Sequence, residues 1–109
     1  MTATYDAVLD ALGDRTRRTV LERLRDDGPL PVVAIARDLP VSRPAVSQHL
    51  KVLKDAGLVV DRQEGTRRIY AIDPTGLSLL RAYVEAFWQG VLMTYARAAE
   101  AAMPLDVEQ

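Results

Sequence analysis

The stretch SRPAVSQHLKVLKDAGLV, from Ser42 to Val59, constrains the fold of this chain most. Its apolar residues recur at intervals of three and four, the spacing that an α-helix brings to one side. Ser42 is placed to cap this helix, Pro44 suits its first turn, and Gly57 suits a left-handed cap at its end. The stretch therefore predicts one amphipathic helix over residues 43–56.

The two sides of this helix differ in chemistry. A helical wheel places Val46, Leu50 and Leu53 together as an apolar stripe. The opposite arc is polar and consists of Arg43, Pro44, Ser47, Gln48, Lys51, Lys54 and Asp55. Amide and guanidinium side chains can form paired hydrogen bonds with adenine and guanine, so this arc suits the major groove of DNA. A helix face exposed only to water would also be polar, and the neighbouring elements decide between the two interpretations.

Apolar periodicity, glycines and prolines divide the rest of the chain into further elements. Short helices are predicted over residues 4–12, 15–25 and 32–39, strands over 58–64 and 68–72, and a long helix over 75–102. The expected fold is mainly α with a small β-hairpin, in the order α-α-α-α-β-β-α. All 109 residues are expected to form one domain, in which residues 32–56 are a helix-turn-helix and residues 58–72 are a wing.

The predicted wing is rich in arginine. Arg62 lies on its first strand, and Arg67 and Arg68 lie beside its tip. Residues 43–68 contain six basic and three acidic side chains, although the whole chain has a net charge of −1. Guanidinium groups on a wing can reach phosphates or the minor groove, whereas basic residues on a short hairpin can also prevent association between sheet edges. Together with the helix-turn-helix, they favour DNA binding.

The composition argues against several other classes of protein. The chain has no cysteine and one histidine, which excludes a disulfide framework and argues against a transition-metal site within one chain. No apolar run approaches the roughly 20 residues that cross a bilayer, and the first ten residues lack the basic flank and apolar stretch of a signal peptide. We therefore expect a cytoplasmic protein with no metal and no other cofactor.

Three segments resemble the ArsR (SmtB/ArsR-type) family of winged helix-turn-helix repressors. They are LGDRTRRTVLERL at residues 12–24, SRPAVSQHLKVLKDAGLV at 42–59 and GTRRIYAID at 65–73. The resemblance implies a homodimer that pairs through its first and last helices, binds a palindromic operator on double-stranded DNA, and releases it when a ligand binds. The cysteines and last-helix histidines of the family's metal sensors are missing here. The chain thus resembles a metal-independent branch, and its small-molecule effector, if it has one, is unknown.

The candidate DNA-binding residues come from the recognition helix, its cap and the wing. They are Ser42, Arg43, Pro44, Ser47, Gln48, His49, Lys51, Arg62, Arg67 and Arg68. His49 lies toward the apolar stripe, so a hydrogen bond within the domain is the alternative to a base contact. Ser42 can serve as a helix cap, as a phosphate ligand or as both. Arg15, Arg17 and Arg18 are expected to form a solvent-exposed face, with phosphate contacts as the alternative.

The last predicted helix is apolar around most of its circumference, which is more apolar surface than so short a chain can cover alone. A second copy can cover it, with the same patch on both partners. The predicted dimer interface consists of Tyr5, Val8, Leu9, Leu12, Leu80, Tyr83, Val84, Phe87, Trp88, Val91, Leu92 and Tyr95. The alternative is a helix that packs in a monomeric core. A cavity between the last helices, lined by Phe87, Trp88 and Tyr95, would suit an apolar ligand, and plain core packing is the alternative for these three residues.

These features predict a sequence-specific regulator of transcription, and in particular a homodimeric repressor that occupies a promoter. The alternative is a winged-helix module that binds protein and not DNA, since a fold does not dictate function. An enzyme is not expected, because Ser47 and His49 point in divergent directions on their helix. The sequence also lacks a nucleophile elbow, a phosphate-binding loop and an evident pair of catalytic carboxylates.

Overall fold

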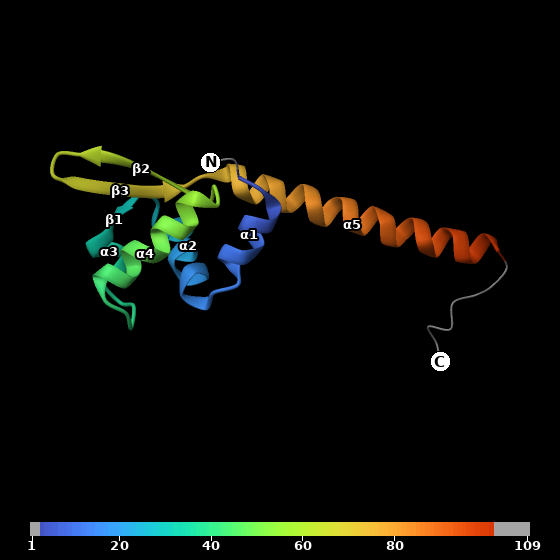
Figure 1. The fold of residues 1–109 in the computed structure, drawn as a ribbon, viewed down its shortest axis with the longest axis horizontal. Coiled ribbons are helices and arrows are strands. Elements are labelled where there is room, and N and C mark those ends of the chain that lie inside the picture. The colour runs from blue at the N-terminus through green and yellow to red at the C-terminus, as the bar shows by residue number, and fades with distance from the viewer. Residues whose placement is uncertain (1–2, 102–109) are drawn as a thin grey trace.

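The computed structural model describes residues 3–101, and this part of the chain contains five helices and three strands (Figure 1). The helices are α1 (Tyr5–Leu12), α2 (Arg15–Asp27), α3 (Val32–Ala36), α4 (Arg43–Asp55) and α5 (Pro74–Glu100). The strands are β1 (Leu30–Pro31), β2 (Val59–Glu64) and β3 (Arg67–Ile72). The predicted mainly α fold with a β-hairpin is confirmed. Residue 102, the predicted end of the last helix, lies outside the described residues.

Local hydrogen bonds hold both ends of α4. At its start, the backbone N–H of Ala45 donates to Oγ of Ser42 at 3.3 Å, so Ser42 is the cap that the sequence predicts. At its end, Gly57 has φ +78°, and the N–H of Leu58 donates to the carbonyl of Leu53 at 2.9 Å. This is the Schellman motif, whose left-handed position glycine adopts without strain.

The apolar stripe of α4 packs into the centre of the protein. Val46, Leu50 and Leu53 have no exposed surface. The buried cluster around them consists of Val8, Ala11, Val20, Leu21, Leu24, Ile35, Val46, Leu50, Leu53, Ala56, Leu58 and Val59. Burial of apolar surface stabilises by about 25 cal/mol per Å². Because α1, α2, α3 and β2 all contribute to this cluster, α4 is held from several sides in one orientation.

The wing is the antiparallel hairpin of β2 and β3, paired from Val59 opposite Ile72 to Glu64 opposite Arg67. A third strand was not predicted. β1 pairs antiparallel with β3, so the sheet order is β1-β3-β2. Leu30 and Pro31 are too few to show the alternation of apolar and polar residues that marks a strand in a sequence. They form a strand only because the fold places β3 beside them.

The helix α3 is shorter than predicted. It ends at Ala36, three residues before the expected end at Leu39. The N–H of Leu39 donates to the carbonyl of Ala36 at 3.1 Å, a bond between residues three apart rather than four. Pro40 disfavours the helical conformation for the residue before it, so the chain turns here before Ser42 starts α4.

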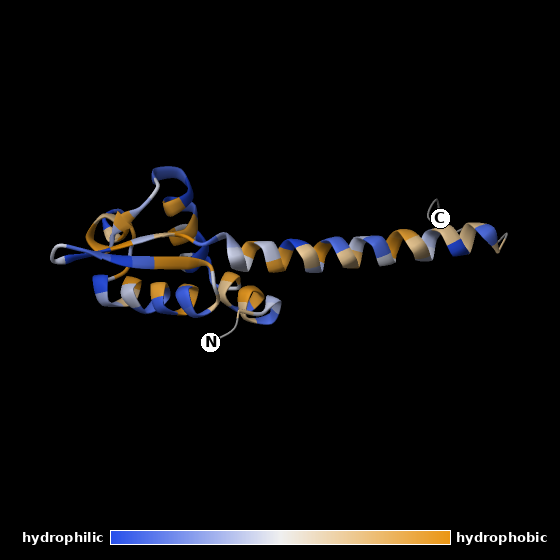
Figure 2. Cartoon of the chain, turned by 90° about the horizontal axis from the view of Figure 1, so that it is seen from above, coloured by the Kyte–Doolittle hydropathy of each residue, from blue (hydrophilic) through white to orange (hydrophobic). Residues whose placement is uncertain are grey.

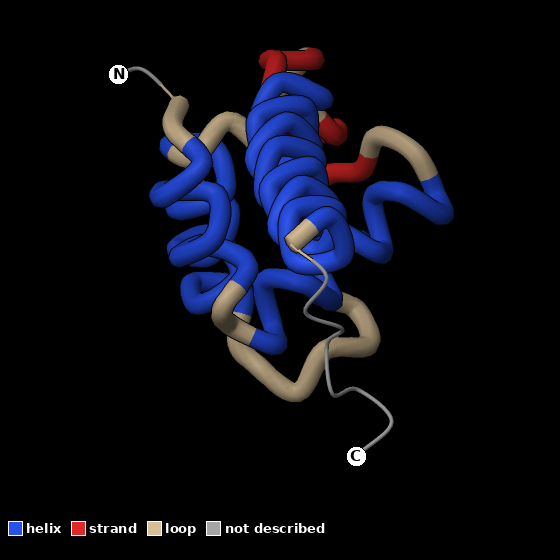
Figure 3. Tube along the Cα trace, turned by 90° about the vertical axis from the view of Figure 1, so that its right-hand side faces the viewer, coloured by secondary structure: helices blue, strands red, loops and turns tan. Residues whose placement is uncertain are grey.

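The helix α5 leaves the other elements after its first turns. The N–H of Gly76 donates to the carbonyl of Gly57 at 2.8 Å, which joins the start of α5 to the end of α4. Tyr83 then stacks on Tyr5 of α1, with ring centroids 4.6 Å apart. Beyond this contact the helix projects away from the other helices, as Figures 1 and 3 show from the side and from its free end. The Cα radius of gyration is therefore 19.2 Å, against about 13 Å for a compact domain of this length.

Candidate nucleic-acid interface

The polar arc of α4 is exposed to solvent, opposite the stripe that packs into the core. All its members are exposed, namely Arg43, Pro44, Ser47, Gln48, Lys51, Lys54 and Asp55, and so is the helix cap Ser42. Because the opposite side of α4 is anchored in the buried cluster, these side chains protrude together from a helix that cannot rotate freely. A helix that reads base edges needs this arrangement, since only its exposed side enters the groove.

The start of α4 and the tip of the wing lie at the same end of the molecule, far from the free end of α5 (Figure 1). A solvent-open hollow of about 260 Å³ lies between them. Its walls are Pro31, Val32, Val33, Arg43, Thr66, Arg67 and Arg68. A second hollow shares Val32 and Arg43 with the first and extends to Ser47. Helix and wing therefore form one concave surface whose charged residues are arginines.

The three arginines of the wing differ in their partners. Arg62 donates to the Glu64 carboxylate at 2.8 Å, and Arg68 donates to the Asp61 carboxylate at 3.0 Å. No carboxylate among residues 3–101 lies within ion-pair distance of Arg67. Figure 2 shows that both strands are hydrophilic toward the tip and hydrophobic toward the body. The wing thus presents Arg67, at its tip, with its charge uncompensated.

Asp61 lies on β2 at the base of the wing, and its side chain is 8% exposed. Its carboxylate accepts from Nζ of Lys54 at 2.8 Å and from Arg68 at 3.0 Å. The hydrogen bonds from Lys54 and Arg68 lower the pKa of Asp61, against the opposing effect of burial. The link made by Asp61 was not predicted. Its burial was predictable from the sequence, because alternation along a strand places Asp61 on the same face as buried Val59.

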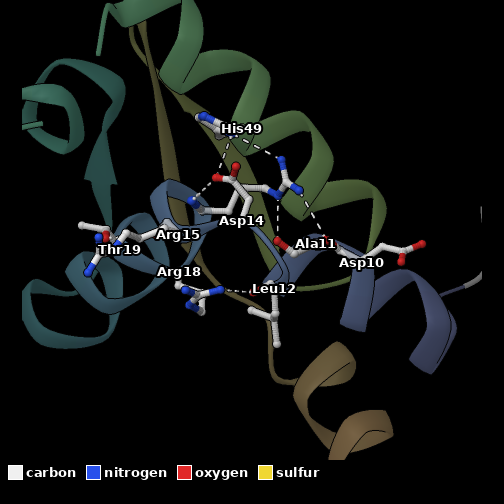
Figure 4. Close-up of polar contacts among 9 residues, drawn as sticks. Asp10, Ala11, Leu12, Asp14, Arg15, Arg18, Thr19 and His49 are labelled. Carbon is white, nitrogen blue, oxygen red and sulfur yellow. Dashed lines mark hydrogen bonds and ion pairs between the residues drawn. The ribbon is translucent and has the colours of Figure 1, made fainter. Parts of the chain in front are cut away.

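His49 contacts the protein itself (Figure 4). Its Nδ1 lies 3.5 Å from the guanidinium of Arg17 and 3.9 Å from the carboxylate of Asp14. The backbone N–H of Arg17 also donates to Asp14 at 3.0 Å and lowers the pKa of that carboxylate. These contacts agree with the alternative stated for His49, a hydrogen bond within the domain. A base contact by His49 stays a prediction.

Two arginines of α2 bind the end of α1, which was not predicted. Nε of Arg17 donates to the carbonyl of Ala11 at 2.7 Å, and Arg18 donates to the carbonyl of Leu12 at 2.6 Å. The last carbonyls of a helix have no partner within the helix, and cationic side chains stabilise that end. The expectation of a solvent-exposed face is therefore wrong for Arg17, which is partly buried, whereas Arg18 is exposed as expected and also donates to α1. The carbonyls that both side chains meet belong to the preceding helix, which the pattern of α2 alone does not reveal.

Large apolar side chains are exposed on α1 and along α5. They are Tyr5, Leu9, Leu77, Tyr83, Val84, Phe87, Trp88, Leu92, Met93 and Tyr95. Phe87 is 64% exposed. A hollow of about 360 Å³ on this helix is lined by Tyr83, Val84, Phe87 and Trp88. Hydrophobic residues recur along the whole of α5 in Figure 2. Monomeric proteins rarely expose apolar patches of this extent, which mark interaction surfaces.

Some residues predicted for the dimer interface instead contribute to the core of the protomer. Val8 has no exposed surface and belongs to the buried cluster, so its assignment to the interface is wrong. Leu12 and Leu80 are half-buried against the same cluster. The spacing of apolar residues identified the apolar side of α1. It did not show that this side is divided between the core, which takes Val8, and the solvent, which meets Leu9.

Among residues 3–101, no three His, Cys, Asp or Glu side chains come together as a metal ion requires. No helix in the same part combines the length and hydropathy needed to span a membrane.

Comparison with known proteins relates most of the chain to regulators of transcription. The family described as "Helix-turn-helix domain" matches residues 12–62, from the end of α1 into β2. The HTH-type transcriptional regulator Rv2034 of Mycobacterium tuberculosis is 60% identical over 92 residues, which are 84% of this chain and 85% of that protein.

Solved structures give the same relationship. An ArsR-like transcriptional regulator from Rhodococcus sp. RHA1 has a TM-score of 0.80 at 27% identity and covers 93% of this chain and 94% of that one. The homodimeric winged helix-turn-helix DNA-binding domain Mb0332 from Mycobacterium bovis, a possible ArsR-family transcriptional regulator, has a TM-score of 0.61 at 33% identity. That match covers 77% of each chain.

Proposed function

Since the chain belongs to the ArsR family of winged helix-turn-helix transcriptional regulators, we propose that it represses transcription by occupying a palindromic operator as a homodimer. The protein is a DNA-binding transcriptional regulator, and its family is not a class of enzymes. Repression follows if the operator overlaps a promoter, because the bound dimer then blocks access to that DNA.

The proposal rests mainly on one observation, the exposed polar side of α4 opposite a fully buried stripe. Gln48 and Ser47 lie at the centre of this side, and short amides and hydroxyls suit base edges in the major groove. Arg43 and Lys51 flank them and can reach guanine or phosphates. These four residues are therefore proposed to enter the groove together.

The wing and the cap of α4 are proposed to hold the duplex by its backbone. Arg67 has the charge least compensated on the wing, while Arg62 and Arg68 would share their charge between a carboxylate and phosphate. The N–H groups at the start of α4, beside Ser42, can also donate hydrogen bonds to a phosphate, since the N-terminus of a helix attracts anions. In this arrangement residues 32–56 read the sequence and residues 58–72 grip the backbone.

Self-association is proposed through the exposed apolar side chains of α1 and α5. Mb0332 is homodimeric, and in this chain Tyr5 and Tyr83 already stack where the two helices meet. A two-fold dimer would place one recognition helix in each of two successive major grooves, roughly 34 Å apart. The palindromic operator follows from this symmetry. A cytoplasmic location is proposed with it, since a regulator must reach the chromosome.

Selection of duplexes from a random-sequence library by the purified protein tests the function. We expect recovery of a palindrome whose binding weakens steeply with salt, because each phosphate contact releases counterions. Fluorescence anisotropy of the recovered duplex between 50 and 300 mM salt, roughly the range over which phosphate-dominated binding collapses, measures this. Failure to enrich any duplex, with protein partners retained instead, would contradict the proposal and favour the protein-binding alternative.

Light scattering tests the dimer. We expect a species of twice the 12.0 kDa protomer mass, without DNA, at micromolar concentration. A stable species of 12.0 kDa under these conditions would rule out the proposed interface.

A further inference from the structure

Asp61 joins three elements that the proposed interface needs in register. Its carboxylate accepts from Lys54 in the last turn of α4 and from Arg68 on β3, while Asp61 itself lies on β2. The wing register pairs Gln63 with Arg68, so the bond from Arg68 to Asp61 runs diagonally across the two strands. One carboxylate therefore ties the recognition helix to both strands of the wing.

The burial of this carboxylate gives the link its strength. The side chain of Asp61 is 8% exposed, whereas those of Lys54 and Arg68 are about half exposed, at 51% and 48%. Hydrogen bonds to a charged, nearly buried group are stronger than those between solvated side chains, and loss of one leaves that group unsatisfied. Another ion pair of α4, between Lys51 and Asp55, is exposed on both sides and has no such effect.

We propose that Asp61 is a positioning residue for DNA binding, which holds the wing at a set angle to α4 and leaves Arg67 as the wing guanidinium directed at DNA. This inference rests on the proposed function. Asp61 compensates the charge of Arg68, so the neighbouring arginines of β3 have different tasks. Arg68 braces the wing through Asp61 and shares its charge with a phosphate, whereas Arg67 at the tip offers its whole charge to the duplex.

If Asp61 positions the wing, Asp61→Asn should change the affinity for the operator in the direction opposite to that expected from charge alone. Asp61→Asn removes a negative charge from a DNA-binding protein and releases Lys54 and Arg68, so simple electrostatics predicts tighter binding to every duplex. Positioning predicts weaker binding to the operator, because the wing no longer sits at the angle that lets helix and wing engage together. The matched control is Asp55→Asn, which removes the same charge from the exposed pair with Lys51.

The experiment measures anisotropy titrations of wild type, Asp61→Asn and Asp55→Asn. Each is titrated against the duplex that wild type selects from a random library and against a scrambled duplex of the same composition. For Asp61→Asn we expect about tenfold weaker binding to the selected duplex and little change on the scrambled one, so the ratio of the two affinities falls. For Asp55→Asn we expect equal or up to about twofold tighter binding on both duplexes.

Tighter binding of Asp61→Asn to the selected duplex would overturn the positioning role, and so would an equal change on both duplexes. Circular dichroism monitors folding. If Asp61→Asn is unfolded, Lys54→Met replaces it, since methionine keeps most of the packed stem and breaks only the link to α4. A selective loss on the selected duplex supports the inference there too, and an equal loss on both duplexes contradicts it. If wild type selects no duplex, the proposed function itself fails, which is a different outcome.

Discussion

Single residues at the proposed interface differ in the kind of contact that they offer. Gln48 projects from the middle of the exposed side of α4, where an amide can recognise one base pair, whereas Arg67 lies at the wing tip with no carboxylate among residues 3–101 to pair with it. An amide distinguishes bases by its paired donor and acceptor, and a guanidinium beside the backbone responds to charge. Substitution of Gln48 therefore tests the proposed recognition of bases, and substitution of Arg67 tests the proposed contact with the DNA backbone.

Gln48→Ala is expected to relax the preference for one position in each half-site by about 1–3 kcal/mol, with a smaller effect on scrambled DNA. Arg67→Ala is the matched comparison and should weaken all sequences alike, with a shallower salt dependence. Titrations against the selected duplex, its single-base variants and scrambled DNA measure both. An unchanged base preference in Gln48→Ala would remove Gln48 from the reading surface.

Acid is expected to destabilise the protein through Asp61. Lys54 and Arg68 lower the pKa of this carboxylate from its ordinary value of 3.8, so the unfolded chain binds its proton more readily than the folded one. The contribution to the free energy of unfolding is complete above pH 3.8 and is lost as pH falls through the lowered value. Urea denaturation from pH 7 downward should therefore show Asp61→Asn less stable than wild type at neutral pH, with the two curves converging in acid. Asp55→Asn, which removes the exposed pair with Lys51, should stay close to wild type throughout.

At the scale of whole elements, the end of α4 and the start of α5 meet backbone to backbone. Gly57 is the left-handed cap of α4, and its carbonyl accepts from Gly76 in the first turn of α5 at 2.8 Å. A Cβ on Gly76 would lie 2.7 Å from this carbonyl oxygen and 3.0 Å from that of Ala56. The absence of a side chain at Gly76 therefore lets α5 leave the protein in the direction that the structure shows.

Gly76→Ala is expected to lower the free energy of unfolding by about 1–3 kcal/mol, because the new methyl group meets backbone that cannot rotate away. Alanine in a helix would otherwise stabilise by up to about 1 kcal/mol, so the clash reverses the usual sign. Ser78→Ala, at an exposed position two residues later, serves as the control and should be neutral or slightly stabilising. Thermal denaturation of the three proteins measures this. A stabilised Gly76→Ala protein would show that the two helices can separate there without cost.

The whole molecule is extended because α5 projects beyond the elements that could cover it. The principal extents are 67 × 29 × 21 Å, and residues 81–90 of α5 are all exposed. Many of these residues are large and apolar, and Phe87 and Trp88 are among the most exposed. A surface of this kind is stable in water when another chain buries it, and a second copy offers the same surface.

Phe87→Glu is expected to dissociate the proposed dimer, since two-fold symmetry would bury two unpaired carboxylates in one interface. The cost should be about 3 kcal/mol or more of dimerisation free energy. Gln89→Glu adds the same charge on the opposite side of α5 and should leave the dimer intact. Sedimentation velocity gives the oligomeric state, and operator titrations should show a matching loss of affinity only for Phe87→Glu. Dissociation of both variants would place the interface elsewhere on α5.

Several features of this protein were predictable from the sequence because they depend on neighbours along the chain. Ser42 and Gly57 delimit α4 through bonds to residues three to five positions away, and the spacing of Val46, Leu50 and Leu53 identifies the side that is buried. The exposed side follows as its complement. The family was recognisable for the same reason, since its characteristic residues lie in continuous segments.

Other features were decided only by the tertiary structure. The strand β1, the bonds of Arg17 to α1 and the link from Lys54 through Asp61 to Arg68 all join residues that are distant in sequence or on different elements. Their partners become neighbours only after the core has packed. Periodicity identifies the apolar side of an element and not what covers it, which is why Val8 was assigned to the wrong surface. Local bonds shape each element before folding is complete, whereas the pairing of charges and strand edges depends on where packing brings those elements together.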